Sequence, residues 1–61
     1  MATRDEIRVM QANHYFALLS IRKQNEGYVV KGLQHAISQS KAGMLEPDIA
    51  WVEKQVAEAF S

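Results

Sequence analysis

The absence of cysteine is the feature that most constrains this chain, because a short sequence must then find its stability elsewhere. A chain of 61 residues buries only about 60% of the surface that its unfolded form exposes, so its own core supplies little stability. Small domains usually add a disulfide, a metal ion or a partner chain. Without cysteine there is no disulfide and no thiolate metal site, and His14 and His35 are the only imidazoles. We therefore expect a partner chain to support the fold.

Charge and hydropathy disfavour several classes of partner. Seven basic residues balance seven acidic ones, so no net charge attracts the chain to nucleic acid or to an anionic membrane. The longest apolar run, YFALL, is far shorter than the roughly 18 residues that a membrane span needs. The first residues, MATRDEIR, show no basic segment followed by an apolar run. We expect a cytoplasmic protein with no membrane partner.

A first helix is predicted from its capping signals. Thr3 and Glu6 form a T-x-x-E capping box, in which each side chain accepts a hydrogen bond from a free backbone amide of the first turn. Apolar residues then recur as far as Ile21. The next residues, RKQNEG, supply basic side chains for the carbonyl end of a helix and then turn formers. We expect a helix over Arg4–Lys23.

A second helix is expected between Asn25 and Gly43. Asn25 can cap its start, and Gly43 can end it in the left-handed conformation, with Met44 folding back as the hydrophobic residue after it. One alternative stays open, because the segment Gly27–Val30 has strand propensity and could be extended. The apolar stripe of this helix comprises Val29, Val30, Leu33, Ala36 and Ile37.

A third helix is predicted to begin near Pro47, which suits the first turn, with Leu45 or Glu46 at the boundary and Asp48 near the positive end of the helix dipole. Its apolar face comprises Ile49, Val52, Val56, Ala59 and Phe60. The fold class is therefore all-α. We expect one domain over residues 1–61, a small three-helix bundle in which a helical hairpin packs on a longer N-terminal helix, and we expect it to be dimeric.

The first helix carries more apolar surface than one core can easily cover. At about 100° per residue, its apolar side chains form two nearly opposite stripes. The first stripe comprises Ile7, Met10, His14, Ala17, Leu18 and Ile21. The second stripe comprises Val9, Ala12, Phe16 and Leu19. Either a monomeric bundle covers both stripes, or one stripe packs within the chain and the other against a second copy.

Trp51, the only tryptophan, raises the same question on the third helix. It falls among polar residues, opposite the face that carries Val52 and Val56. Its ring could fold over the turn at Leu45–Pro47 or over a lysine stem. Alternatively it anchors a protein interface, where tryptophan is enriched among the residues that dominate binding energy. In either case we expect the ring to be partly exposed in the isolated chain.

Catalytic and cofactor signatures do not occur in the sequence. His14 lies on the first apolar stripe, where a lone histidine is more often a hydrogen-bonded core or interface residue than a catalyst. His35 has no evident partner one turn away, because Lys31 and Gln39 flank it. There is no H-E-x-x-H motif, no G-x-S-x-G motif and no glycine-rich phosphate loop. We expect no enzyme activity, no metal site and no cofactor.

The segment ISQSKAGMLEPDIAWVEKQV resembles a helix-turn-helix, with Gly43 as the turn glycine. The resemblance implies a small DNA-binding regulator. Two features depart from the pattern. Gln39 occupies the position, four residues before the glycine, where a small residue usually lies. From Ala42 onward, Lys54 alone opposes four acidic residues, so the supposed recognition helix would meet phosphate with a net negative charge.

These observations favour a small protein-protein interaction module of the adaptor, regulator or inhibitor type. Its size and helicity are those of many small bacterial or phage proteins. We expect it to act through exposed apolar helix faces and to form a homo-oligomer, most simply a homodimer. The predicted interface residues are Val9, Phe16, Leu19 and Trp51. The alternative is the DNA-binding regulator.

Overall fold

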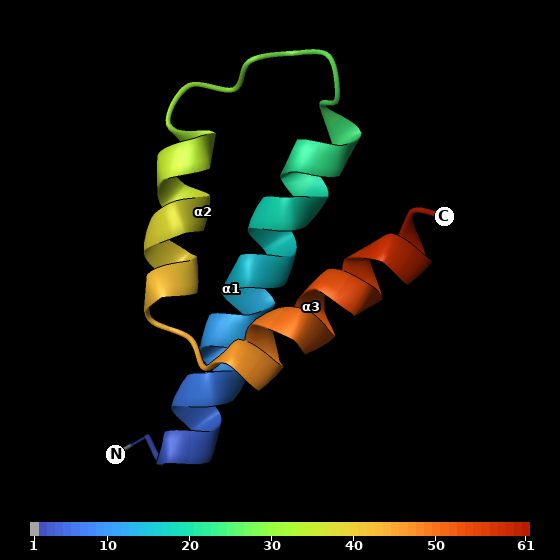
Figure 1. The fold of residues 1–61 in the computed structure, drawn as a ribbon. Coiled ribbons are helices and arrows are strands. Elements are labelled where there is room, and N and C mark those ends of the chain that lie inside the picture. Colours follow the sequence, from blue (N-terminus) through green and yellow to red (C-terminus); the bar gives the residue numbers. More distant parts are fainter. Residues whose placement is uncertain (1) are drawn as a thin grey trace.

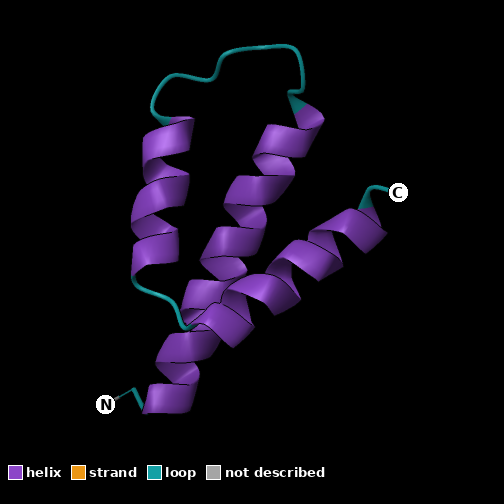
Figure 2. Ribbon diagram, viewed as in Figure 1, coloured by secondary structure: helices purple, strands orange, loops and turns teal. Residues whose placement is uncertain are grey.

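The computed structural model describes residues 2–61, and these residues form three helices and no strand. Helix α1 spans Arg4–Gln24, α2 spans Leu33–Ala42 and α3 spans Glu46–Ala59. Figures 1 and 2 show α2 returning beside α1, and α3 leaving the short α2–α3 turn to cross α1. The predicted all-α fold class is confirmed.

Helix α1 begins where its capping residue predicts. The Thr3 hydroxyl accepts a hydrogen bond from the Glu6 backbone amide at 3.2 Å, with Thr3 in the extended conformation. The helix ends at Gln24, one residue later than predicted, and Asn25 then closes it. The Asn25 side-chain amide donates to the Ile21 carbonyl at 2.8 Å, and its backbone amide donates to the same carbonyl at 3.1 Å.

The predicted start of the second helix is wrong. Asn25 caps the end of α1 instead, and Tyr28, Val29 and Val30 lie in the connecting loop, with Val29 fully exposed. The backbone explains the difference, because Gly27 and Gly32 adopt φ angles of 93° and 79°, which other residues rarely adopt. Helix α2 therefore begins only after Gly32. Gly27–Val30 is therefore not helical, and it does not form the strand that its propensity allowed either.

The predicted conformation of Gly43 is also wrong, because its φ angle is −90°. Helix α2 ends by a tightening of its last turn: the Gly43 amide donates to the Ser40 carbonyl at 3.3 Å, and the Met44 amide donates to the Lys41 carbonyl at 3.1 Å. These bonds use the carbonyls that a left-handed cap would otherwise satisfy. Met44 is half-buried against the core, as its predicted folding back requires.

Helix α3 begins as predicted, with Leu45 at the cap and Pro47 in the first turn. Its inner face is narrower than the sequence indicates. Val52 and Val56 are buried and Ile49 is half-buried, but Phe60 at the end of the helix is 41% exposed. Among the described residues, no helix is long and apolar enough to cross a membrane.

The core lies where α2 and α3 each pack against α1, with α2 beside α1 and α3 crossing it (Figure 1). From the second predicted stripe it takes Leu19, with Ala12 and Phe16 half-buried beside it. Tyr15, which belongs to neither predicted stripe, is 2% exposed, and its hydroxyl donates to the Glu53 carboxylate at 3.2 Å. The buried side chains are Tyr15, Leu19, Ile37, Val52 and Val56.

Candidate interaction surfaces

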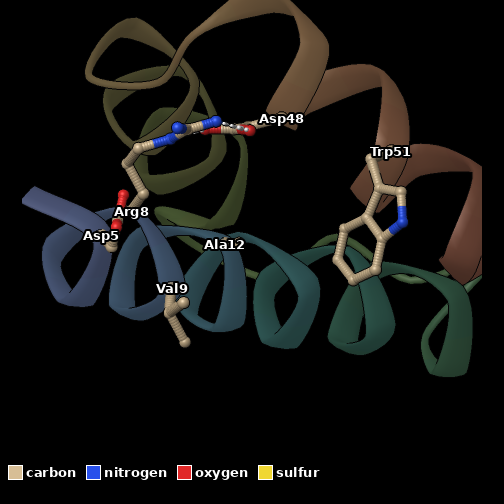
Figure 3. A pocket seen from close by; sticks show the side chains of 6 residues that line it. All are labelled: Asp5, Arg8, Val9, Ala12, Asp48 and Trp51. Atoms are coloured by element: carbon tan, nitrogen blue, oxygen red, sulfur yellow. Dashed lines mark hydrogen bonds and ion pairs between the residues drawn. The ribbon is translucent and has the colours of Figure 1, made fainter.

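A groove between α1 and α3 contains the tryptophan. It has a volume of about 290 Å³, and Figure 3 shows the Trp51 ring projecting from α3 toward α1. Trp51 and Val9 are each 58% exposed, so the groove presents apolar surface to solvent from both helices. We call it the Trp51 groove. Its lining residues are Asp5, Arg8, Val9, Ala12, Asp48 and Trp51.

An ion pair closes one end of the Trp51 groove. Arg8 reaches from α1 to Asp48 in the first turn of α3, as Figure 3 shows, with Nε to Oδ2 at 3.1 Å and Nη2 to Oδ1 at 2.9 Å. This two-bond geometry fixes both side chains. Hydrogen bonding from Arg8, together with its positive charge, lowers the pKa of Asp48 below the ordinary 3.8. The residues are forty positions apart, so no local sequence signal links them.

The structure separates the four predicted interface residues. Val9 and Trp51 lie together on the Trp51 groove and are exposed. Phe16 is half-buried against the core, and Leu19 is 2% exposed within it. Leu19 therefore has no free surface to offer a partner in this fold. Contact of Val9 and Trp51 with another protein stays a prediction, while the predicted exposure of the Trp51 ring is confirmed.

A second apolar surface runs along α1 over side chains that stay exposed to solvent. Ile7, Met10 and Ile21 are 45%, 65% and 40% exposed, and His14 and Ala17 between them are exposed too. These five residues are the first predicted stripe without Leu18, which is half-buried. We call them the α1 seam. They were absent from the predicted interface, although their regular spacing, at alternating steps of three and four residues, is visible in the sequence.

The other exposed groups, on the α1–α2 loop and at the two histidines, do not gather into a recognisable site. Tyr28 and Val29 are exposed at the α1–α2 loop, and both histidines are exposed on helices. Within residues 2–61, no three side chains of the His, Cys, Asp or Glu type gather as a metal site would require. The Trp51 groove and the α1 seam are both mainly apolar, and Leu45, which is 56% exposed, lines a further hollow with Arg4, Ile7 and Arg8.

Comparison of the chain with protein-family models, with curated proteins and with solved structures finds no match.

Proposed function

We propose that this protein is a non-enzymatic protein-interaction module that binds another protein through the Trp51 groove. The observation that carries the proposal is the exposure of Trp51, at 58%, beside an equally exposed Val9 from the neighbouring helix. A large aromatic side chain that is half exposed to water would contribute favourable binding free energy if another protein covered it. Tryptophans in such positions are often the residues whose truncation costs most at protein interfaces.

The charges around the groove favour an apolar partner side chain. Arg8 and Asp48 satisfy each other through two hydrogen bonds, so a partner that enters the groove need not supply an opposite charge for either. Ala12, with its small apolar side chain, also lines the groove. An aliphatic or aromatic side chain of another protein would cover the indole and Val9, and the ion pair would lie at the edge of the contact, as polar residues do in most interfaces.

DNA binding is the alternative, and the fold contributes one observation in its favour. The turn between α2 and α3 comprises three residues, 43–45, the length found in helix-turn-helix proteins. The charges of α3 oppose it. Glu46, Asp48, Glu53 and Glu58 lie on this helix with Lys54 as the one cation, and phosphate contacts supply most of the affinity of DNA-binding proteins.

Capture of binding proteins from the native host tests the proposal. We expect immobilised wild-type protein to retain a defined protein that Trp51→Ala does not retain. The matched control is Val29→Ala, which truncates a fully exposed apolar side chain on the loop and should retain the same protein. Circular dichroism of each variant verifies the fold. Equal retention of the captured protein by wild type and by Trp51→Ala would refute the proposal. A salt-sensitive mobility shift of duplex DNA that both wild type and Trp51→Ala produce would also refute it, in favour of DNA binding.

Tryptophan fluorescence provides a second readout on the same site. Trp51 is the only tryptophan of this chain, so the emission of the free protein reports the groove alone. We expect acrylamide to quench Trp51 readily in the free protein and much less in the complex, once the emission of the captured protein alone has been subtracted. Unchanged quenching in the complex would place the binding site elsewhere on the surface.

A further inference from the structure

We infer that the partner places a basic side chain, lysine or arginine, at the Asp5 end of the Trp51 groove, next to the apolar side chain that covers the indole. The inference rests on the proposed function, because it names the chemistry of the partner that occupies the same groove. The occupant is therefore a segment of another protein in which an apolar residue and a basic residue lie close together.

The charges that line the groove do not balance. Its lining residues include two carboxylates, Asp5 and Asp48, and one guanidinium, Arg8. Arg8 donates two hydrogen bonds to Asp48. Across residues 2–61, by contrast, the exposed side chain of Asp5 takes part in no hydrogen bond and no ion pair. The groove thus has one surplus negative charge, and Asp5 is the lining group whose charge a partner can meet.

Asp5 and the indole lie at opposite ends of the groove. Figure 3 shows Val9 and Ala12 between Asp5 and Trp51 along α1. Because an α-helix rises 1.5 Å per residue, Asp5 and Ala12 are about 10 Å apart along the helix axis. Lysine and arginine carry their charge at the end of an aliphatic stem, so the stem can lie beside Val9 while the cation reaches Asp5. A neighbouring apolar residue of the same segment then covers Trp51.

The neighbouring charges favour a cation at this end of the groove and not elsewhere. Arg4, which is adjacent to Asp5 in sequence, lines the other hollow, and none of the residues that line that hollow is acidic. Lys54 lies one helical turn beyond Trp51, in the direction away from Asp48, and does not line the groove. A basic side chain therefore meets an opposite charge at Asp5, whereas an acidic one would meet a like charge there.

Three short peptides test the charge of the occupant directly. The probe is acetyl-Leu-Gly-Arg-amide, and two matched peptides replace its arginine by citrulline, which has nearly the same shape without the charge, or by glutamate. Nuclear magnetic resonance of isotope-labelled protein follows the backbone amides of Asp5 and Val9 and the indole N–H of Trp51. We expect the arginine peptide to bind about threefold more tightly than the citrulline peptide, as an exposed ion pair allows, and the glutamate peptide to bind least.

Two adjacent carboxylates of α1 provide a matched pair of variants. Asp5 and Glu6 both lie in the first turn of α1 and are both exposed, so their charges interact similarly with the helix dipole, but Asp5 alone of the two lines the groove. Asp5→Asn should remove the preference for the arginine peptide over the citrulline peptide. Glu6→Gln should leave that preference intact, and Trp51→Ala should weaken the binding of all three peptides.

Several results of the peptide titrations would overturn the inference. Equal binding of the arginine and citrulline peptides to wild type would refute it and leave the proposed function, because an apolar side chain would then suffice. The same holds if no peptide gives a saturable shift at roughly 20 mM, where even weak contacts become populated. A preference that Glu6→Gln removes as fully as Asp5→Asn would show that the charge of the first turn in general, and not the groove, is responsible.

The protein captured through Trp51 provides a second measurement. Asp5→Lys should weaken its binding at least about tenfold, because a cation would then face the basic side chain of the partner. Glu6→Lys makes the same change of net charge outside the groove and should weaken binding much less. A protein that Trp51→Ala loses but Asp5→Lys binds as tightly as wild type would refute the inference alone, whereas equal capture by wild type and Trp51→Ala would refute the proposed function itself.

Discussion

The two apolar faces of α1 belong to the same helix but differ in what covers them. On one face, Tyr15 and Leu19 are each 2% exposed beneath α2 and α3. On the other face, Met10 and Ile21 are 65% and 40% exposed. Hydrophobicity alone does not separate the faces. A wide apolar arc, broadened by Tyr15 and Phe16, accommodates two flanking helices, whereas a narrow heptad stripe is wide enough for only one.

Truncation of one side chain on each face is the most severe test of this comparison. Leu19→Ala should lower the free energy of unfolding by about 2–5 kcal/mol, which is enough to unfold much of a domain this small. Met10→Ala should change it by no more than about 0.5 kcal/mol in dilute solution, because the side chain is already in water. Urea unfolding followed by circular dichroism measures both. Similar losses for the two variants would mean that α1 does not have one covered and one open face.

Much of the fold could be predicted from local signals in the sequence. Thr3 starts α1 and Pro47 lies in the first turn of α3, because capping and proline geometry involve only neighbouring residues. The start of α2 could not be predicted in this way. Asn25 is equally suited to closing one helix and to opening the next, and the structure uses it to close α1.

The candidate site was less predictable, because it depends on contacts between distant residues. The exposure of Trp51 followed from its position among polar residues, away from the helix face that carries Val52 and Val56. The pairing of Arg8 with Asp48, and of Tyr15 with Glu53, depends on how α3 crosses α1. Tyr15 is amphipathic: its ring is buried in the core, and its hydroxyl donates a hydrogen bond to Glu53, which lies on the exposed edge of that core.

The stability of two glycine variants, Gly43→Ala and Gly32→Ala, tests where the covered face of α1 ends. Gly43 lies over Gln11, between the core face and the α1 seam, and an added Cβ there would approach the Gln11 side-chain nitrogen at 3.5 Å, an ordinary contact. Since its φ angle is −90°, Gly43→Ala should change stability by less than about 1 kcal/mol, toward greater stability. Gly32→Ala, at a φ angle of 79°, should destabilise by about 1–2 kcal/mol.

Thermal unfolding of the two glycine variants provides the measurement. If Gly43→Ala is the more destabilised of the two, the α2–α3 turn approaches α1 more closely than the structure shows. In that case the boundary of the covered face lies nearer to the α1 seam.

Removal of the Tyr15 hydroxyl tests whether the covered face needs its polar contact. Tyr15→Phe keeps the ring but loses the hydrogen bond to Glu53, so it should cost about 0.5–1.5 kcal/mol. The control is Tyr28→Phe, whose ring is 80% exposed and whose loss of the hydroxyl should have no effect. Chemical denaturation of both variants compares them directly. Equal free energies of unfolding for Tyr15→Phe and Tyr28→Phe would show that the hydrogen bond to Glu53 contributes nothing to the stability of the fold.

The hydrogen bond between Tyr15 and Glu53 should also change how the stability of the fold depends on pH above neutrality. Burial, followed by the charge of Glu53 and its hydrogen bond, raises the pKa of Tyr15 above its ordinary 10.0. A group whose pKa is raised on folding stabilises the folded state fully below its unfolded pKa, and this contribution is lost as pH rises through the folded pKa. Wild-type protein should therefore lose stability above about pH 10 more steeply than Tyr15→Phe does. Parallel profiles for the two proteins would contradict this role.

The smallest expected effect on stability comes from the ion pair between Arg8 and Asp48, which lines the Trp51 groove. Arg8 lowers the pKa of Asp48 below 3.8, and a carboxyl group with a lowered folded pKa stabilises the fold above its unfolded pKa and loses that contribution as pH falls through the folded value. Wild type should thus exceed Asp48→Asn in melting temperature near neutral pH, and the difference should vanish as acid protonates Asp48. Because the Arg8 side chain is 48% exposed, added salt should shrink the difference as well. A difference that persists unchanged in acid strong enough to protonate Asp48 would show that the carboxylate charge, and with it the ion pair to Arg8, does not contribute to the stability of the fold.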